Sequence, residues 1–276
     1  MKNEEYFLDE DISFEEQNQQ NLQNEQKSDN KSTRTPRKKK RKKKNLLLRF
    51  FLIICLIILI FVFLSSSLFD ISEIAVQNNS YYTSEQIISI AGAKTGGNIF
   101  ISGTGKMKSK LLLDPYIKNA KVARSLPSKI NISVDERKEA AYLTYRTDFI
   151  IIDNEGIVLR QASVAPKLTA IEGVTIKSME LGKPISVEEN AIMTETITLL
   201  KKMQEQKIYF KKIKVSSVVV KVYIYDSLIC QAPPLVLAES MSQLNDVLYD
   251  LYKKGIQRGL ITMGDDGYFS FSPVPE

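Results

Sequence analysis

Apolar and polar positions divide this chain of 276 residues into stretches of different character. Residues 1–33 carry nine Asp and Glu and almost no large apolar residue after Phe14, whereas residues 46–69 are almost continuously apolar. The residues that follow alternate between short apolar runs and polar turns. A segment as polar as the first cannot bury enough apolar surface to offset its chain entropy. We therefore expect a disordered tail over residues 1–45, a membrane helix over 46–69, and folded domains after it.

The apolar stretch is long enough to cross a membrane. Its 24 residues would span about 36 Å as a helix, against a hydrocarbon core of about 30 Å. No Lys or Arg occurs from Phe50 to Ala93, and basic residues favour the cytoplasmic side of a membrane helix. The basic run at residues 37–44, directly before the helix, therefore predicts a single-pass type II protein. Its N-terminus would lie in the cytoplasm and residues from about 70 onward outside. The residues that determine this topology are Arg37, Lys38, Lys39, Lys40, Arg41, Lys42, Lys43 and Lys44.

Two other interpretations of this region stay open. Ser65, Ser66 and Ser67 are small enough for a signal-peptidase site, although the charged leader and the apolar run are both longer than in a typical signal peptide. A basic run can also bind nucleic acid. Its position beside an apolar helix favours the topological role, and we expect a membrane but no nucleic acid as partner.

The first folded stretch, residues 70–139, predicts a small sheet covered by two helices in the order β-α-α-β-β. Thr83 and Gln86 have the spacing of a capping box that opens the first helix, and Gly92 ends it. The second helix runs from about Lys106 to Leu113, before the helix-ending Asp114-Pro115. The last strand alternates strictly, which turns Ile130, Ile132 and Val134 inward. The expected strands are 71–77, 118–124 and 129–135.

Residues 140–276 predict a mixed α/β domain. A hairpin is expected at 149–160 around the turn 153–156. Ser186 and Glu189 have the spacing of a second capping box, which would open a helix reaching about Gln206. Ile192, Thr196, Leu199 and Met203 would share one side of that helix. The remaining expected elements are strands at 211–215, 218–225, 228–231, 260–263 and 268–272 and a helix at 241–254.

The composition excludes several kinds of chemistry. The chain has no histidine, so a Ser-His-Asp triad, a Cys-His pair and ordinary zinc sites are excluded, and we expect no cofactor and no metal. Of the two cysteines, Cys55 lies in the apolar stretch and Cys230 in an apolar strand, which favours a buried small side chain over a nucleophile.

Short motifs that resemble catalytic signatures are better explained as turns and loops. Lys94-Thr95-Gly96 matches one element of penicillin-recognising enzymes, but the Ser-x-x-Lys at 28–31 lies in the predicted cytoplasmic tail. Gly103–Lys106 lacks the remaining residues of a P-loop and is expected to be a loop. Asp153, Glu155, Asp265 and Asp266 could supply the carboxylates of a wall hydrolase, but all four lie in turn-like sequences. We therefore expect no enzyme.

Several of these segments together resemble the POTRA domain of the FtsQ/DivIB cell-division proteins. The resemblance rests on Phe69-x-Ile71, Gly97-x-Ile99-Phe100, the stretch 115–127 (PYIKNAKVARSLP), and 130–137 (INISVDER) with its Glu136-Arg137 pair. Pro166–Thr169 is similar to the proline-led strand of the family's β-domain. Glu139, Ala170 and Thr262 stand where the family often has proline, glycine and aspartate.

The resemblance implies a bitopic scaffold of the divisome at the division septum. Such proteins join two small bitopic proteins, an FtsL-like and a DivIC/FtsB-like partner, and help control septal peptidoglycan synthesis, with septal synthases as further partners. A C-terminal edge strand can accept a partner's strand, so the candidate partner-binding residues are Tyr268, Phe269, Ser270 and Phe271. A membrane-anchored sensor or sporulation assembly protein with the same architecture and other partners is the alternative.

Overall fold

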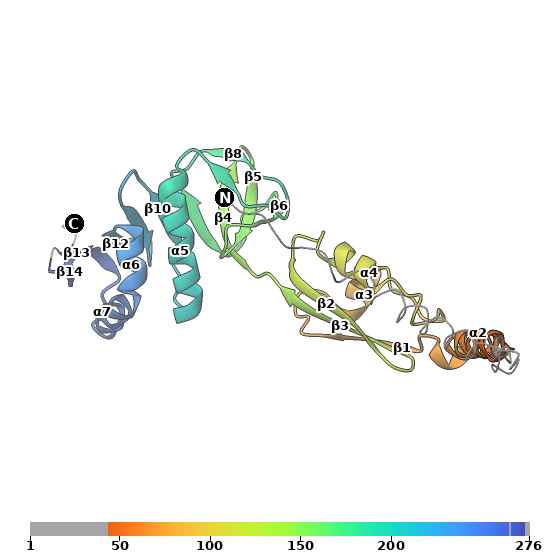
Figure 1. The fold of residues 1–276 in the computed structure, drawn as a ribbon. Coiled ribbons are helices and arrows are strands. Elements are labelled where there is room, and N and C mark those ends of the chain that lie inside the picture. The colour runs from red at the N-terminus through yellow and green to blue at the C-terminus, as the bar shows by residue number, and fades with distance from the viewer. Residues whose placement is uncertain (1–43, 265, 274–276) are drawn as a thin grey trace, which may run out of the picture. The chain divides into compact units, whose positions relative to one another are not determined.

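The computed structural model describes residues 44–264 and 266–273, and Figure 1 shows the elements in order. Residues 1–43 of the predicted tail, with the basic residues 37–43, and Asp265 lie outside the described residues, whereas Lys44 and Asn45, also predicted in the tail, already belong to a helix. The first described element is α2 (Lys44–Leu64), of which Leu46–Leu64 is long and apolar enough to cross a membrane. The helix ends before the apolar run does, since Ser67–Phe69 form a short 3-10 turn, η1. Phe69 is buried with Ile71 in the core of the next domain, so the apolar run supplies both the helix and this core.

The domain that follows has the predicted β-α-α-β-β order. Its sheet has the strand order β1-β3-β2, with β1 parallel and β2 antiparallel to β3. Helix α4 begins at Thr104 with Gly103 as its N-cap, so Thr104–Lys106, predicted as part of a loop, instead form its first turn. The elements are β1 (Glu73–Gln77), α3 (Ser84–Ala91), α4 (Thr104–Leu111), β2 (Ile117–Ser125) and β3 (Lys129–Glu136).

Local sequence signals position these elements. The capping box of α3 is confirmed: the Gln86 N–H donates to the Thr83 hydroxyl at 3.3 Å, and the Thr83 N–H donates to Gln86 Oε1 at 2.8 Å. Gly92 ends the helix with φ +64°, a backbone conformation that favours glycine. Ile130, Ile132 and Val134 are buried, as the alternation predicts, and pack with the two helices in one apolar cluster.

The second domain is built on a sheet of nine strands in the order β14-β13-β12-β11-β10-β7-β4-β5-β6. The predicted hairpin is confirmed as β5 and β6, which pair antiparallel. The strands of this sheet are β4 (Glu139–Tyr145), β5 (Asp148–Asp153), β6 (Val158–Ala162), β7 (Thr169–Glu172), β10 (Lys212–Val215), β11 (Val220–Tyr223), β12 (Ser227–Ala232), β13 (Arg258–Met263) and β14 (Phe269–Ser272). The helices are α5 (Asn190–Gln206), α6 (Pro234–Glu239) and α7 (Met241–Lys253).

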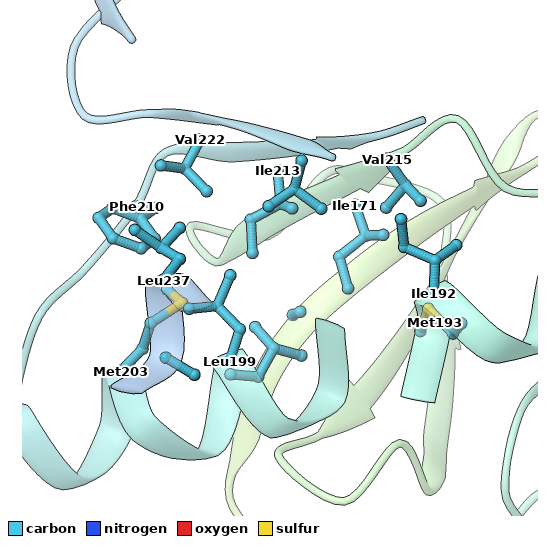
Figure 2. Close-up of a cluster of buried hydrophobic side chains, with 14 of the residues drawn as sticks. Ile171, Ile192, Met193, Leu199, Met203, Phe210, Ile213, Val215, Val222 and Leu237 are labelled. Carbon is cyan, nitrogen blue, oxygen red and sulfur yellow. The ribbon is translucent and has the colours of Figure 1, made fainter. Parts of the chain in front are cut away.

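One face of this sheet forms the core with α5, α6 and α7. A row of directly paired residues crosses eight strands on that face, from Ile150 on β5 to Phe271 on β14. All of them except Phe271 are buried. Figure 2 shows side chains of α5 pointing toward the strands, among them Ile192, Leu199 and Met203. Thr196 is buried on the same side, which confirms the predicted helix face. The residues of the row are Ile150, Leu143, Ile171, Ile213, Val222, Cys230, Ile261 and Phe271.

The predicted second capping box is wrong. Ser186 lies in the short strand β9 (Ser186–Val187), which pairs with β8 (Ile176–Ser178), and α5 begins only at Asn190. Glu189 does not cap the helix through its side chain. Instead its carboxylate accepts hydrogen bonds from the Thr175 N–H at 2.8 Å and from the Thr175 hydroxyl at 3.3 Å. Glu189 therefore bonds to a residue distant in sequence and does not cap the helix as its local spacing predicted.

Candidate partner-binding site

The C-terminal strand β14 lies at one end of the nine-stranded sheet. Within the described residues its single strand neighbour is β13, to which it pairs antiparallel. The other end of the sheet, β6, is partly covered, because the Val158 N–H donates to Lys183 O at 2.9 Å and the Gly182 N–H donates to Val158 O at 2.8 Å. The two edges therefore differ: β6 is covered at its first residue, whereas within the described residues no strand lies beyond β14.

The register shows which backbone groups of β14 point to the open side. The Gly264 N–H donates to Tyr268 O at 2.9 Å, which makes this a hydrogen-bonded pair. Such pairs alternate with non-bonded pairs along an antiparallel ladder. Ser270 and Ser272, opposite Thr262 and Leu260, therefore bond to β13. The N–H and C=O groups of Phe269 and Phe271 point away from β13, toward the open edge.

Side chains of the four predicted partner-binding residues have two different environments. Tyr268 is 69% exposed and Ser270 is also exposed, its hydroxyl 2.9 Å from that of Thr262. Phe269 and Phe271 are half-buried and pack against the domain core. Phe271 lies against Gly259, whose φ is +142°. A Cβ added at this glycine would come within 2.3 Å of the Phe271 ring.

Acidic residues at the junction of the two domains form ion pairs rather than an open carboxylate pair. Arg137 Nη1 lies 2.6 Å from Asp153 and 2.7 Å from Glu155, and Lys118 lies 2.6 Å from the other oxygen of Glu155. Asp153 is buried, and its second oxygen accepts the N–H groups of Glu155 and Ile157. These contacts join the end of the first domain to the β5–β6 turn, which is a structural role.

Glu136, from the Glu-Arg pair at the end of β3, holds the loop before α3. Its carboxylate accepts the backbone N–H groups of Ser80 at 2.6 Å, Tyr81 at 2.6 Å and Tyr82 at 3.2 Å. Burial would raise the pKa of Glu136, but these hydrogen bonds from Tyr81, Ser80 and Tyr82 outweigh it and hold the pKa below its usual value. The glutamate is therefore ionised and fixes a loop that has no strand partner of its own.

Glu139 makes a second link between the domains. Its carboxylate accepts hydrogen bonds from Arg160 Nε on β6 and from the Tyr116 hydroxyl, both at 2.6 Å. The hydrogen bond from Arg160 lowers the pKa of Glu139, against the opposing effect of burial. Sequence reasoning treated Glu139 only as a replacement for proline and did not identify Arg160. An arginine at the end of a predicted strand, directly after Val158 and Leu159, was the available signal for such a partner.

Two features that the sequence excluded from catalysis, Cys230 and the segment Lys94–Gly97, have environments that explain them without a catalytic role. Cys230 is fully buried, and this burial raises the pKa of its thiol to about 12. Gly96 and Gly97 exchange backbone hydrogen bonds with Ile71, so Lys94–Gly97 forms a turn, as predicted. Within residues 44–264 and 266–273, no group of three or more Cys, Asp or Glu side chains gathers in a geometry for a metal ion.

Comparison with known proteins identifies the first domain. The family model described as POTRA domain, FtsQ-type, matches residues 69–137. This range includes Phe69 and Ile71, which precede β1, and the Glu136-Arg137 pair at the end of β3.

Relatives extend the similarity beyond this domain. The cell division protein DivIB of Clostridium acetobutylicum is 33% identical over 126 residues, which cover 45% of this chain and 51% of that protein. DivIB of Bacillus subtilis is 26% identical over 207 residues, which cover 71% of this chain and 73% of that protein. The chain thus spans about half the length of the first of these relatives. The POTRA match and the DivIB relatives agree with the observed β-α-α-β-β domain: residues 69–137 form an FtsQ-type POTRA domain, and the chain is similar to DivIB cell division proteins over most of its length.

Proposed function

We propose that this protein is a membrane-anchored scaffold of the cell-division machinery that docks a partner on the open edge of β14. The observation that carries the proposal is the edge itself, with the N–H and C=O groups of Phe269 and Phe271 directed away from β13. Similarity to DivIB supports the cell-division setting, since these relatives are named as cell division proteins. The protein acts by binding rather than by catalysis.

The docking mode is strand addition by a DivIC/FtsB-like partner. A partner strand beside β14 would satisfy the outward backbone groups of Phe269 and Phe271, and main-chain hydrogen bonds of this kind give affinity. The exposed side chains of Tyr268 and Ser270 would contribute specificity. An FtsL-like protein is the second partner, and through both the scaffold helps control septal peptidoglycan synthesis, with septal synthases as further members of the assembly.

The proposed location is the cell membrane at the division septum. The apolar helix Leu46–Leu64 is the anchor. The basic residues Arg37–Lys44 place the N-terminus in the cytoplasm, and both folded domains lie outside. Imaging of a fluorescent fusion in vegetative cells separates this function from that of a sensor or sporulation protein, since only the division scaffold gathers at every septum.

A proline at Phe271 tests the docking edge. Proline removes one N–H, and at this position the missing donor points to the open side, where edge strands tolerate proline. We expect Phe271→Pro to fold and to weaken binding of the DivIC/FtsB-like partner at least ~10-fold, since several outward contacts depend on this strand's geometry. Phe271→Val removes the ring but keeps the N–H, and it is the matched control for the loss of side-chain packing.

The choice of position follows from the register. Proline at Ser270 would remove a donor that bonds to β13, so Ser270→Pro damages the protein's own sheet and cannot report on docking alone. If Phe271→Pro and Phe271→Val bind the partner equally well, measured by titration calorimetry with the full chain in nanodiscs, the outward N–H takes no part in docking. The partner would then have to bind elsewhere than along β14.

A further inference from the structure

Four large apolar side chains are exposed at one end of the POTRA domain. They are Leu68 (57% exposed), Phe100 (40%), Ile101 (85%) and Leu126 (60%), and we call them the apolar rim. Exposed apolar residues that occur singly need no explanation, but a group of large ones at one place marks an interaction surface.

The rim lies next to the last turn of helix α2. Asn98 Nδ2 donates a hydrogen bond to Leu64 O, the last residue of the helix, at 2.8 Å. Phe69 connects the two parts: its ring lies 5.4 Å from that of Phe63 in α2 and 5.2 Å from that of Phe100. The Ile99 N–H donates to Phe69 O at 2.8 Å, so the loop that carries Phe100 and Ile101 is fixed to the helix exit.

Arg124 and the β2–β3 turn complete the rim. The Arg124 guanidinium donates to Ile99 O at 2.7 Å and to Ser102 O at 2.6 Å, which fixes both ends of the loop. The Ser72 N–H donates to Ser128 O at 2.9 Å, so the turn that carries Leu126 lies at the same end of the sheet as the helix exit. The rim is therefore a fixed arrangement rather than a set of unrelated loop residues.

We propose that the apolar rim inserts into the outer interface of the lipid bilayer and fixes the POTRA domain against the membrane surface. This inference rests on the proposed function, in which α2 spans the membrane. Leu64 then lies at the outer end of the span, and side chains held beside it lie at the depth of the headgroups and first acyl carbons. Apolar side chains bind favourably at that depth. Lipid is the partner because the rim is continuous with the lipid-facing helix.

Tryptophan fluorescence can test this placement, since the chain contains no tryptophan. Ile101→Trp in the full-length protein, reconstituted into phosphatidylcholine vesicles with brominated acyl chains, provides a single reporter on the rim. Leu113→Trp is the matched control, because Leu113 is 82% exposed in the same domain, at the other end of α4. Ile57→Trp, within α2, reports whether the helix itself is inserted.

We expect bromolipid to quench Ile101→Trp at least ~2-fold more than Leu113→Trp, and soluble iodide to quench it correspondingly less. Equal quenching at Ile101 and Leu113, with strong quenching at Ile57, would overturn the proposal and leave the membrane anchor intact. Absence of bromolipid quenching at Ile57 would instead refute the anchor, and the lipid-facing rim with it. The two failures are therefore distinguishable.

Discussion

Replacing Glu136 with glutamine tests whether this carboxylate holds the loop before α3. The carboxylate accepts three backbone N–H groups, from Ser80 and Tyr81 on one oxygen and from Tyr82 on the other. Glutamine has one oxygen in place of two and carries no charge. In Glu136→Gln, the single oxygen can accept two of the N–H groups. The amide NH2 faces the third N–H, and because both groups are donors, that hydrogen bond is lost.

The expected cost follows from these contacts. A hydrogen bond to a charged group contributes about 1.5–3 kcal/mol and a neutral one about 0.5–1.5 kcal/mol. At the lower ends of these ranges, two bonds weakened by about 1 kcal/mol each and one lost bond of about 1.5 kcal/mol give a loss of about 3.5 kcal/mol in the free energy of unfolding. For a folded region of this size, about 2–4 °C per kcal/mol predicts a fall in Tm of about 7–14 °C.

The lowered pKa of Glu136 also predicts how the effect of the substitution on stability changes with pH. The pKa of Glu136 lies below its ordinary value in the folded protein, and an unfolded glutamate has a pKa of about 4.3. The stabilisation is therefore fully present above about pH 4.3 and is lost as the pH falls through the lower folded pKa. The difference in Tm between the natural protein and Glu136→Gln should be largest at pH 7 and should shrink below about pH 4.

Calorimetry at pH 7 and pH 3.5 measures this difference, and amide exchange at Tyr81 and Tyr82 reports on the loop itself. Glu188→Gln is the control, because Glu188 is exposed and forms no ion pair in the part of the chain that the structure describes. A Tm change of less than about 1 °C for Glu136→Gln, with unchanged exchange at both tyrosines, would refute the proposed role of this carboxylate.

Three further experiments test other parts of the molecule. Gly259→Ala should destabilise the protein by about 1–3 kcal/mol in thermal unfolding, because the added methyl group meets the Phe271 ring at a positive φ; an unchanged Tm would contradict this packing. Cys230 should react with a thiol reagent only after unfolding, since it is buried with a raised pKa, and rapid labelling of the folded protein would disprove that environment. A reporter that works only in the cytoplasm should be active when fused before Arg37 and silent after Asp70; the opposite pattern would reverse the proposed topology.

Local signals in the sequence predicted the elements whose partners lie nearby. The Thr83–Gln86 capping box and the alternation of β3 involve contacts within a few residues or a single buried face, and both are confirmed. Glu189 shows the limit of such reasoning, because its carboxylate binds Thr175, which local spacing does not reveal. The short helix α6 was not predicted, although Pro234 at its start is a recognised helix signal.

The candidate site depends on contacts distant in sequence. The sequence predicted a terminal strand but not its direction of pairing, and only the register shows that Phe269 and Phe271 direct their backbone groups outward. The apolar helix ends at Leu64, earlier than the sequence predicted, for a similar reason. Phe69 is as apolar as the helix residues, but it belongs to the core of the POTRA domain.

Amide hydrogen exchange along β14 tests the proposed docking edge most directly. In the free protein, the N–H groups of Ser270 and Ser272 bond to β13 and should exchange slowly, while those of Phe269 and Phe271 should exchange fast. When a DivIC/FtsB-like partner saturates the full-length protein in nanodiscs, the account predicts that exchange at Phe269 and Phe271 slows by about 10-fold or more. Unchanged exchange at both residues, with the partner bound, would contradict docking by strand addition.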